Sequence, residues 1–245
     1  MMEFFDLKNI SERFMEIVNP TSEEKILKIG AVLGLNENSR IIDFGCGYGE
    51  TLALWAEHFD ISGIGIDIRE HACRRAKKKI ADRGFDRRIK IVCGSADEYA
   101  FDPGIFDVAA CMGASFIWDG YRSAIQNMKK AVSDGGKLVI GETYRKVKAF
   151  PPEFSEEEKK FPLEHEIVHA ARREGLDLEY MVRSSRDDWD RYEAENWYGF
   201  FRWLAENPDH PDRLQVIDTL RKYQDDYFRF GGKFLGWAMF ILTAI

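Results

Sequence analysis

The chain has 245 residues, of which 45% are hydrophobic and 31% charged, a balance typical of globular proteins and not of disordered ones. This length fits one α/β domain with additions. The formal net charge of −7 argues against a nucleic-acid partner, because binding to a phosphate backbone relies on clustered Lys and Arg.

The first 20 residues form an amphipathic segment in which apolar side chains recur among charged ones. This pattern predicts one or two short helices that cap a cleft, and plain packing on a sheet is the alternative. Ser22 is a suitable N-cap for a helix over residues 22–33, which Gly34 ends.

An apolar run over residues 41–44 leads into a turn with three glycines at alternate positions, Gly45, Gly47 and Gly49. The run predicts a parallel strand that is buried on both faces. Because glycine has no Cβ, such a turn can take positive φ angles and let a ligand lie against the backbone. A helix is predicted from Glu50, with its free N–H groups facing this crevice. The alternative is a tight strand-to-helix turn that binds nothing.

Two classes of cofactor use such a turn. The dinucleotide fingerprint ends in a small residue where this chain has Glu50, whose carboxylate would repel a pyrophosphate. Asp43 adds negative charge two residues before the first glycine, which suits the ammonium and sulfonium groups of S-adenosylmethionine. The turn therefore favours S-adenosylmethionine over NAD.

The pattern Asp43-x-Gly45-x-Gly47-x-Gly49 resembles the first motif of class I S-adenosylmethionine-dependent methyltransferases. The resemblance covers roughly residues 21–245 in the order of the predicted elements. It implies a Rossmann-like α/β fold, with a seven-stranded, mostly parallel sheet and an antiparallel last strand. It also implies methyl transfer that yields S-adenosylhomocysteine, with Cys46 and the three glycines at the cofactor.

A second apolar strand, residues 61–67, ends in Asp67. Its spacing from the glycine turn is the one expected of a carboxylate that accepts hydrogen bonds from both ribose hydroxyls. Asp67 could at the same time cap the helix predicted over residues 69–83. The resemblance places Ile68 next to the adenine.

A third strand, residues 89–93, leads to a turn containing Ala96 and Asp97. This turn resembles the adenine-contacting turn of the family, in which the carboxylate binds the exocyclic amine and the preceding N–H reaches a ring nitrogen. An ordinary Asx-type turn is the alternative.

A fourth strand, residues 106–112, must end at the crevice if it and the first strand flank the switch point of the sheet. We therefore expect Met112 and Gly113 to contact the cofactor. Trp118 and Tyr121 are candidates for the substrate wall, or else core residues. No Asn/Asp-Pro-Pro-aromatic motif follows this strand, so the resemblance does not extend to amino-methylating nucleic-acid enzymes.

The later elements alternate between helices and strands. We predict a helix over residues 121–131, a sharp turn at 133–136 and a strand at 137–144, which includes the substrate candidate Tyr144. A loop and short helix at 155–160, a helix at 163–174 and a strand at 178–184 follow.

Residues 186–232 are an insertion where the family has a short connection. Trp189 and other aromatic residues stand here among Asp187, Asp188, Asp190 and Glu193. We interpret the insertion as a helical lid in which Trp189 and these acids bind a cationic or amine-bearing acceptor. Alternatively, the aromatic residues only attach the helices to the domain. The predicted division is cap helices at 1–20, a cofactor-binding domain at 21–185 plus 233–245, and the lid.

His165-Glu166-Ile167-Val168-His169 matches H-E-x-x-H, in which two histidines one helical turn apart bind zinc. This motif leaves a zinc hydrolase as a competing function. No third histidine completes the extended form of the motif, so we expect no metal. A noncatalytic S-adenosylmethionine-binding protein is the third possibility.

The four cysteines, Cys46, Cys73, Cys93 and Cys111, are scattered without a C-x-x-C pair, so we expect reduced thiols and a cytoplasmic location. The N-terminus has no signal-peptide pattern. The apolar end, residues 234–245, is shorter than the roughly 20 residues of a spanning helix, so we predict a buried last strand and no membrane partner. The expected partner is a small-molecule methyl acceptor; neither a catalytic residue nor an oligomeric state follows from the sequence.

Overall fold

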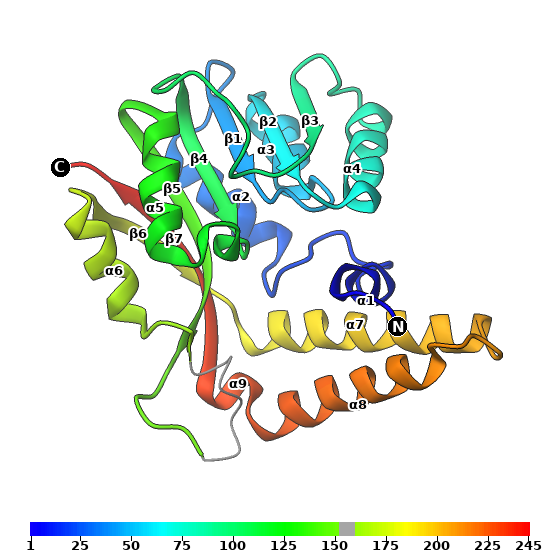
Figure 1. Ribbon diagram of the computed structural model, residues 1–245. Helices are drawn as coiled ribbons and strands as arrows, with labels where there is room; N and C mark the ends of the chain where they lie inside the picture. The colour runs from blue at the N-terminus through cyan, green and yellow to red at the C-terminus, as the bar shows by residue number, and fades with distance from the viewer. Residues whose placement is uncertain (152–159) are drawn as a thin grey trace.

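The computed structural model describes residues 1–151 and 160–245 (Figure 1). In this part of the chain seven strands form one sheet, in the order β3-β2-β1-β4-β5-β7-β6. β7 runs antiparallel to both of its neighbours, and the remaining pairings are parallel. This confirms the predicted fold class. The strand bounds are β1 (Arg40–Phe44), β2 (Ser62–Asp67), β3 (Ile89–Cys93), β4 (Phe106–Met112), β5 (Val132–Arg145), β6 (Asp177–Arg183) and β7 (Leu235–Thr243).

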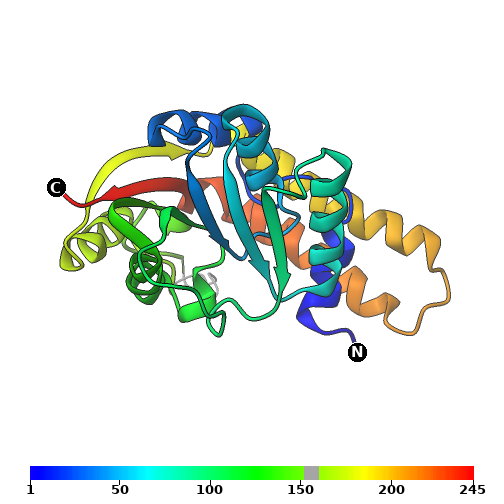
Figure 2. The same cartoon turned by 90° about the horizontal axis from the view of Figure 1, so that it is seen from above.

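Helices cover both faces of the sheet, because successive strand residues point to opposite sides. On β1, Ile41 packs with α2 (Glu23–Leu33), α3 (Glu50–Phe59) and α4 (Glu70–Asp82). The next residue, Ile42, packs with α5 (Tyr121–Ala131) and α6 (Glu164–Arg173). Figure 2 shows the two helical layers on either side of the sheet. Continuous apolar runs in the strands therefore correspond to burial on both faces, as predicted.

Helix ends follow local signals in the sequence. The Ser22 hydroxyl accepts a hydrogen bond from the Lys25 amide at 3.3 Å, and Gly34 ends α2 with a φ of 73°. The predicted helix at 121–131 matches α5. Of the loop and short helix predicted at 155–160, residues 155–159 lie outside the described residues.

The sharp turn predicted at 133–136 is wrong, because these residues belong to β5. Phe106 of β4 pairs with Val132, and Val108 pairs with Lys137, so the intervening residues form a bulge. Gly135 has a φ of 79° at this bulge, a conformation that glycine adopts without strain. The glycines thus mark a local irregularity of the backbone, but the residues on both sides of it pair with the same strand, β4.

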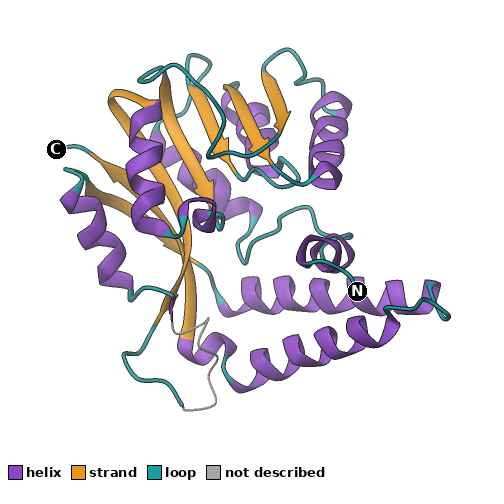
Figure 3. Ribbon diagram, viewed as in Figure 1, coloured by secondary structure: helices purple, strands orange, loops and turns teal. Residues whose placement is uncertain are grey.

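The insertion before β7 is a pair of long helices, α7 (Arg186–Glu206) and α8 (Arg213–Arg229), followed by the short α9 (Gly231–Phe234). Figures 1 and 3 show α7 and α8 side by side beyond the carboxyl ends of β1, β2, β3 and β4, with α1 (Phe4–Ser11) between α7 and the sheet. Ile10 of α1 packs there with Phe200 and Leu220. The N-terminal helix and the helix pair inserted before β7 thus share one small core. Among the helices of the described residues, none combines the length and the hydropathy that crossing a bilayer requires.

Gly199 lets α1 approach the backbone of α7. A Cβ at this position would lie 2.3 Å from the Ser11 carbonyl oxygen and 2.6 Å from that of Ile10. Both atoms belong to the backbone, so neither can rotate away. Close contact with the N-terminal segment therefore depends on glycine.

We expect Gly199→Ala to lower the free energy of unfolding by roughly 1–3 kcal/mol, the usual effect of overpacking, although alanine is the better helix former. Gly94→Ala is the control, because a Cβ there meets nothing within 4 Å. Urea unfolding of both variants measures the difference. Equal stability of the two variants would show that α1 does not pack on α7 as described.

Candidate active site

A cavity of about 340 Å³ lies at the carboxyl ends of β1, β2, β3 and β4, a size within the range of small-ligand pockets. Three parts of the chain line it: the strand ends with the residues that follow them, the N-terminal segment, and Tyr192 of α7. The lining residues from the strand ends are Gly45, Gly47, Ile66, Asp67, Ile68, Arg69, Ser95, Ala96, Asp97, Met112, Gly113, Ala114, Phe116 and Ile117. Those from the N-terminal segment are Phe4, Phe5, Lys8, Glu12, Val18 and Asn19.

The glycine turn is bonded to the end of β2. The amides of Gly45 and Cys46 both donate to the Ile66 carbonyl, at 2.8 and 2.9 Å. Gly45 has a φ of 74°, and a Cβ there would lie 2.4 Å from that of Ala114. The backbone at Gly45 and Gly47 therefore forms part of the cavity wall, as expected of a turn against which a ligand lies.

Asp67 is almost fully buried, and each of its carboxylate oxygens accepts one backbone hydrogen bond. Oδ2 accepts from the Gly47 amide and Oδ1 from the Arg69 amide, both at 2.9 Å. A carboxylate has about four lone-pair positions, so each oxygen can accept a further bond from a ribose hydroxyl. The predicted capping role is wrong, because the N-cap residue of α4 is Arg69 and no side chain caps the helix; Asp67 instead bonds the backbone just before it.

Asp43 lies behind the glycine turn and does not line the cavity. Its side chain is buried, and Oδ1 has no hydrogen-bond partner. Burial, together with the negative charge of Asp67, raises the pKa of Asp43 to about 7. A nearby cation would favour the ionised form, so this carboxylate suits a positively charged cofactor.

The predicted cofactor residues fall into two groups. Those that line the cavity are Gly45, Gly47, Asp67, Ile68, Ala96, Asp97, Met112 and Gly113. Asp43, Cys46 and Gly49 lie behind this wall; a Cβ at Gly49 would lie 3.1 Å from that of Ala76 in α4. The residues present therefore fit S-adenosylmethionine, and the role of each toward the cofactor stays a prediction.

The four substrate candidates are not among the lining residues. Trp118 packs edge-on against Phe44 with ring centroids 5.1 Å apart, and Tyr121 packs in the same core cluster. Tyr144 is 4% exposed beside Phe240, and Trp189 packs against the opposite core cluster. The turn η1 (Ser115–Trp118) instead presents Phe116 and Ile117 to the cavity.

The acids of the insertion are not among the lining residues either. The Asp188 carboxylate accepts from Lys25 and caps α7 at Ser185. The Asp190 carboxylate accepts from Arg186 and from the Tyr227 hydroxyl. The predicted attraction of a cationic acceptor by these acids therefore gains no support from their positions.

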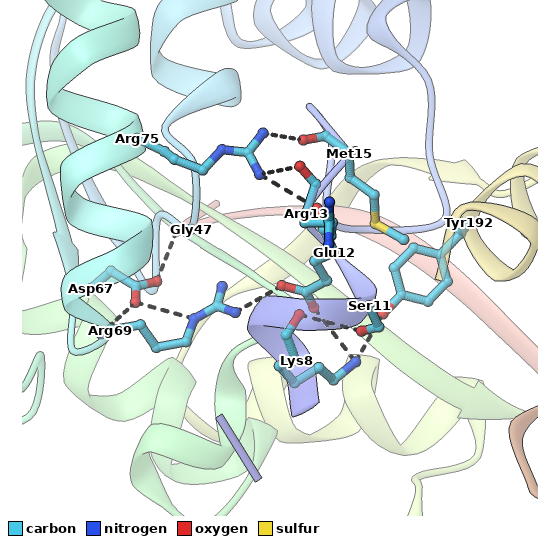
Figure 4. Close-up of polar contacts among 10 residues, drawn as sticks. All are labelled: Lys8, Ser11, Glu12, Arg13, Met15, Gly47, Asp67, Arg69, Arg75 and Tyr192. Atoms are coloured by element: carbon cyan, nitrogen blue, oxygen red, sulfur yellow. Dashed lines mark hydrogen bonds and ion pairs between the residues drawn. The ribbon is translucent and has the colours of Figure 1, made fainter. Parts of the chain in front are cut away.

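The N-terminal segment supplies site residues that the sequence did not single out. Figure 4 shows a line of polar contacts from Asp67 through Arg69 and Glu12 to Lys8 and Tyr192. The Arg69 guanidinium donates to Glu12 at 2.7 Å, and its Nε lies 3.5 Å from Asp67. The amphipathic pattern of residues 1–20 indicated a cap, but only the fold brings Lys8 to Tyr192.

The H-E-x-x-H motif lies on α6, away from the cavity. The rings of His165 and His169 are stacked edge to face with centroids 5.4 Å apart. Glu166 accepts a hydrogen bond from the Leu163 amide at 2.7 Å, at the start of the helix. Within residues 1–151 and 160–245, no three His, Cys, Asp or Glu residues are grouped so as to hold a metal ion. The zinc hydrolase hypothesis has no support in this part of the chain.

Comparisons with known proteins agree with this geometry. A family model described as a methyltransferase domain matches residues 41–136. The chain is 32% identical over its full length to a SAM-dependent methyltransferase from Thiobacillus denitrificans, crystallised with S-adenosylhomocysteine, with complete coverage of both chains and a TM-score of 0.91. The chain belongs to the class I S-adenosylmethionine-dependent methyltransferase family. It uses S-adenosylmethionine as its cofactor, and methyl transfer is its activity.

Two further relatives match most of this methyltransferase. The uncharacterized protein YjhP of Escherichia coli is 32% identical over 240 residues, which cover 96% of each chain. The sterol 4-C-methyltransferase strm-1 of Caenorhabditis elegans is 22% identical over 225 residues, which cover 84% of this chain and 66% of the relative.

We expect Asp67→Ala to weaken the affinity for S-adenosylhomocysteine at least tenfold, because ribose hydroxyls would lose a buried charged acceptor. Asp82→Ala, at the exposed end of α4, should leave the affinity unchanged. Isothermal calorimetry measures both. Unchanged affinity in the Asp67 variant would place the ribose elsewhere.

The raised pKa of Asp43 predicts a pH effect on the stability of the cofactor-free enzyme. The folded carboxyl holds its proton up to a pKa of about 7, whereas the unfolded one loses it near its ordinary value. The folded state thus binds more protons in this interval, and its stability decreases as the pH rises from about 4 to about 7. Relative to Asp43→Asn, the unfolding constant of the wild type should rise by up to about tenfold per pH unit in that window. Urea titrations at each pH measure the free energy of unfolding of both proteins. If it changed with pH in the same way in both, the raised pKa of Asp43 would be contradicted.

Proposed function

We propose that this enzyme transfers the methyl group of S-adenosylmethionine to a small, largely apolar molecule by in-line displacement. One observation carries the proposal: a single cavity joins the glycine turn to an apolar wall made by Phe4, Phe5, Phe116 and Ile117. Phe4 and Phe116 are 60% and 64% exposed, so their rings leave apolar surface at the cavity that a ligand could cover.

The cofactor residues would hold the donor at the strand ends. Asp67 would accept from the ribose, Ile68 and Ala96 would contact the adenine region, and Asp97 would accept from the exocyclic amine. Bound S-adenosylmethionine supplies a methyl group that its sulfonium has already activated. Gly45 and Gly47 would let it lie against the main chain.

The remaining residues would position the acceptor. In-line displacement requires the lone pair of the acceptor to lie about 3 Å from the methyl carbon, with water excluded. Phe4 and Phe5 on α1 and Phe116 on η1 would exclude water and contact the apolar body of the acceptor. A general base is needed only if the acceptor enters protonated.

The relatives support an apolar acceptor, since the Caenorhabditis elegans relative is a sterol methyltransferase and sterols are apolar ring compounds. We keep the division into cap helices at 1–20, a cofactor domain at 21–185 plus 233–245, and a helical lid at 186–232 as part of this proposal.

The four cysteines of the enzyme are free thiols, which supports the proposed cytoplasmic location.

The test uses S-adenosylmethionine with a labelled methyl group and a cell extract fractionated by polarity. We expect label to move from the cofactor to a small molecule in the apolar fractions, with S-adenosylhomocysteine formed in equal amount. Asp67→Ala should lose this transfer and Asp82→Ala should retain it. Label on protein or nucleic acid would contradict the proposed acceptor class, and cofactor binding without any transfer would favour a noncatalytic binding protein.

A further inference from the structure

The N-terminal wall of the cavity carries one lysine, Lys8, whose ammonium lies among aromatic rings. Lys8 comes from α1 and Tyr192 from α7, and both line the cavity. The Nζ of Lys8 lies 3.4 Å from the Tyr192 hydroxyl and 5.9 Å from the ring centroids of Tyr192 and Tyr223. Its side chain is 19% exposed. A long lysine is therefore held in place at the edge of a largely apolar cavity (Figure 4).

The nearest carboxylate does not fully neutralise Lys8. The Oε2 atom of Glu12 lies 2.7 Å from Nη1 of Arg69, whereas its Oε1 atom lies 3.5 Å from Nζ of Lys8. Charge-assisted hydrogen bonds between N–H and carboxylate oxygen are typically about 2.7–2.9 Å long. Glu12 is thus shared between two cations, and Arg69 has the closer contact.

Burial disfavours the charged form of a second carboxylate, Glu193. Burial raises the pKa of Glu193 to about 7, while Lys8 and Asp226 act in opposite directions on it. Burial also opposes the charge on Lys8, but Tyr192 and Glu12 outweigh it and raise the pKa of Lys8 above its ordinary value. Lys8 therefore stays protonated, with an ammonium whose contacts to the protein are long.

We infer that Lys8 and Tyr192 bind an ionised oxygen of the acceptor, a carboxylate or an acidic phenolate carried on an apolar ring system. An ammonium has three donors, and the Tyr192 hydroxyl can turn its proton toward the same oxygen. Phe4, Phe5 and Phe116 provide the apolar surface beside this pair. The inference rests on the proposed function and adds the charge of the acceptor to it.

Lys8 would also affect how the acceptor reacts. If the oxygen at Lys8 is also the methylated one, the ammonium favours its deprotonated, nucleophilic form, and no separate base is needed at neutral pH. If another atom is methylated, Lys8 fixes the orientation of the acceptor. In both cases Lys8 distinguishes an anion from a neutral molecule of the same shape.

The test compares binding of matched probes to enzyme saturated with S-adenosylhomocysteine. One pair is 2-naphthoate with the neutral 2-naphthamide, and the other is 2,4-dinitrophenolate with the neutral 2,4-dinitroaniline; 2-naphthylmethylammonium represents cations. We expect the wild type to bind at least one anion tenfold or more tighter than its neutral partner, and the cation most weakly. The preferred pair tells a carboxylate from a phenolate.

The variants assign this preference to Lys8. Lys8→Met keeps the length of the side chain and removes its charge, and it should reduce the preference for the anion to within twofold. Lys8→Arg should retain most of the preference, and Tyr192→Phe should lower it about threefold. Lys78→Met, on the exposed side of α4, is the control and should change nothing.

Three results would overturn the inference: equal binding of anionic and neutral probes by the wild type, an unchanged preference in Lys8→Met, or no binding of any probe to the loaded enzyme. Calorimetry with S-adenosylhomocysteine accompanies each protein. If the wild type fails to bind S-adenosylhomocysteine, the proposed cofactor site is wrong; if it binds and the probes show no preference, only the role of Lys8 is wrong.

Discussion

The carboxylate of Asp67 is the contact on which the site depends. Through its two oxygens it joins the glycine turn after β1 to the start of α4, at the carboxyl edge of the sheet. Because Oδ2 is fixed by the Gly47 amide, the turn keeps its exposed backbone directed toward the cavity. Arg69 forms ion pairs with both Asp67 and Glu12. The N-terminal wall is therefore linked to Asp67, the residue that would bind the ribose.

This arrangement makes one cavity from distant parts of the chain. The glycine turn and Asp67 come from the sheet, Lys8 comes from α1, and Tyr192 comes from the helix pair inserted before β7. The N-terminal segment also closes on the end of β4, where the Asn19 amide donates to the Met112 carbonyl at 3.1 Å. Donor and acceptor would therefore share a wall, and contacts made by the cofactor would help to shape the space for the acceptor.

The sequence predicted most of what depends on neighbouring residues. The buried strands, the cap at Ser22 and the carboxylate at Asp67 follow from local patterns, and the mostly parallel sheet with its antiparallel last strand follows once the family resemblance is used. The side chains of the proposed acceptor wall did not follow: Phe116 reaches the cavity and Trp118 turns into the core, although they are two residues apart. Lys8 and Tyr192 could not be paired, because 184 residues separate them and only the packing of α1 on α7 unites them. The histidines of α6 show the reverse case, a motif with correct spacing and no third ligand in the described residues.

The most direct test is a crystal structure of the enzyme with S-adenosylhomocysteine bound. The account predicts both ribose hydroxyls within hydrogen-bonding distance of the Asp67 carboxylate, the main chain of residues 45–47 against the ligand, and the sulfur directed toward the space between Phe116 and α1. A ligand whose ribose lies away from Asp67, or whose sulfur faces solvent on another side of the sheet, would contradict it.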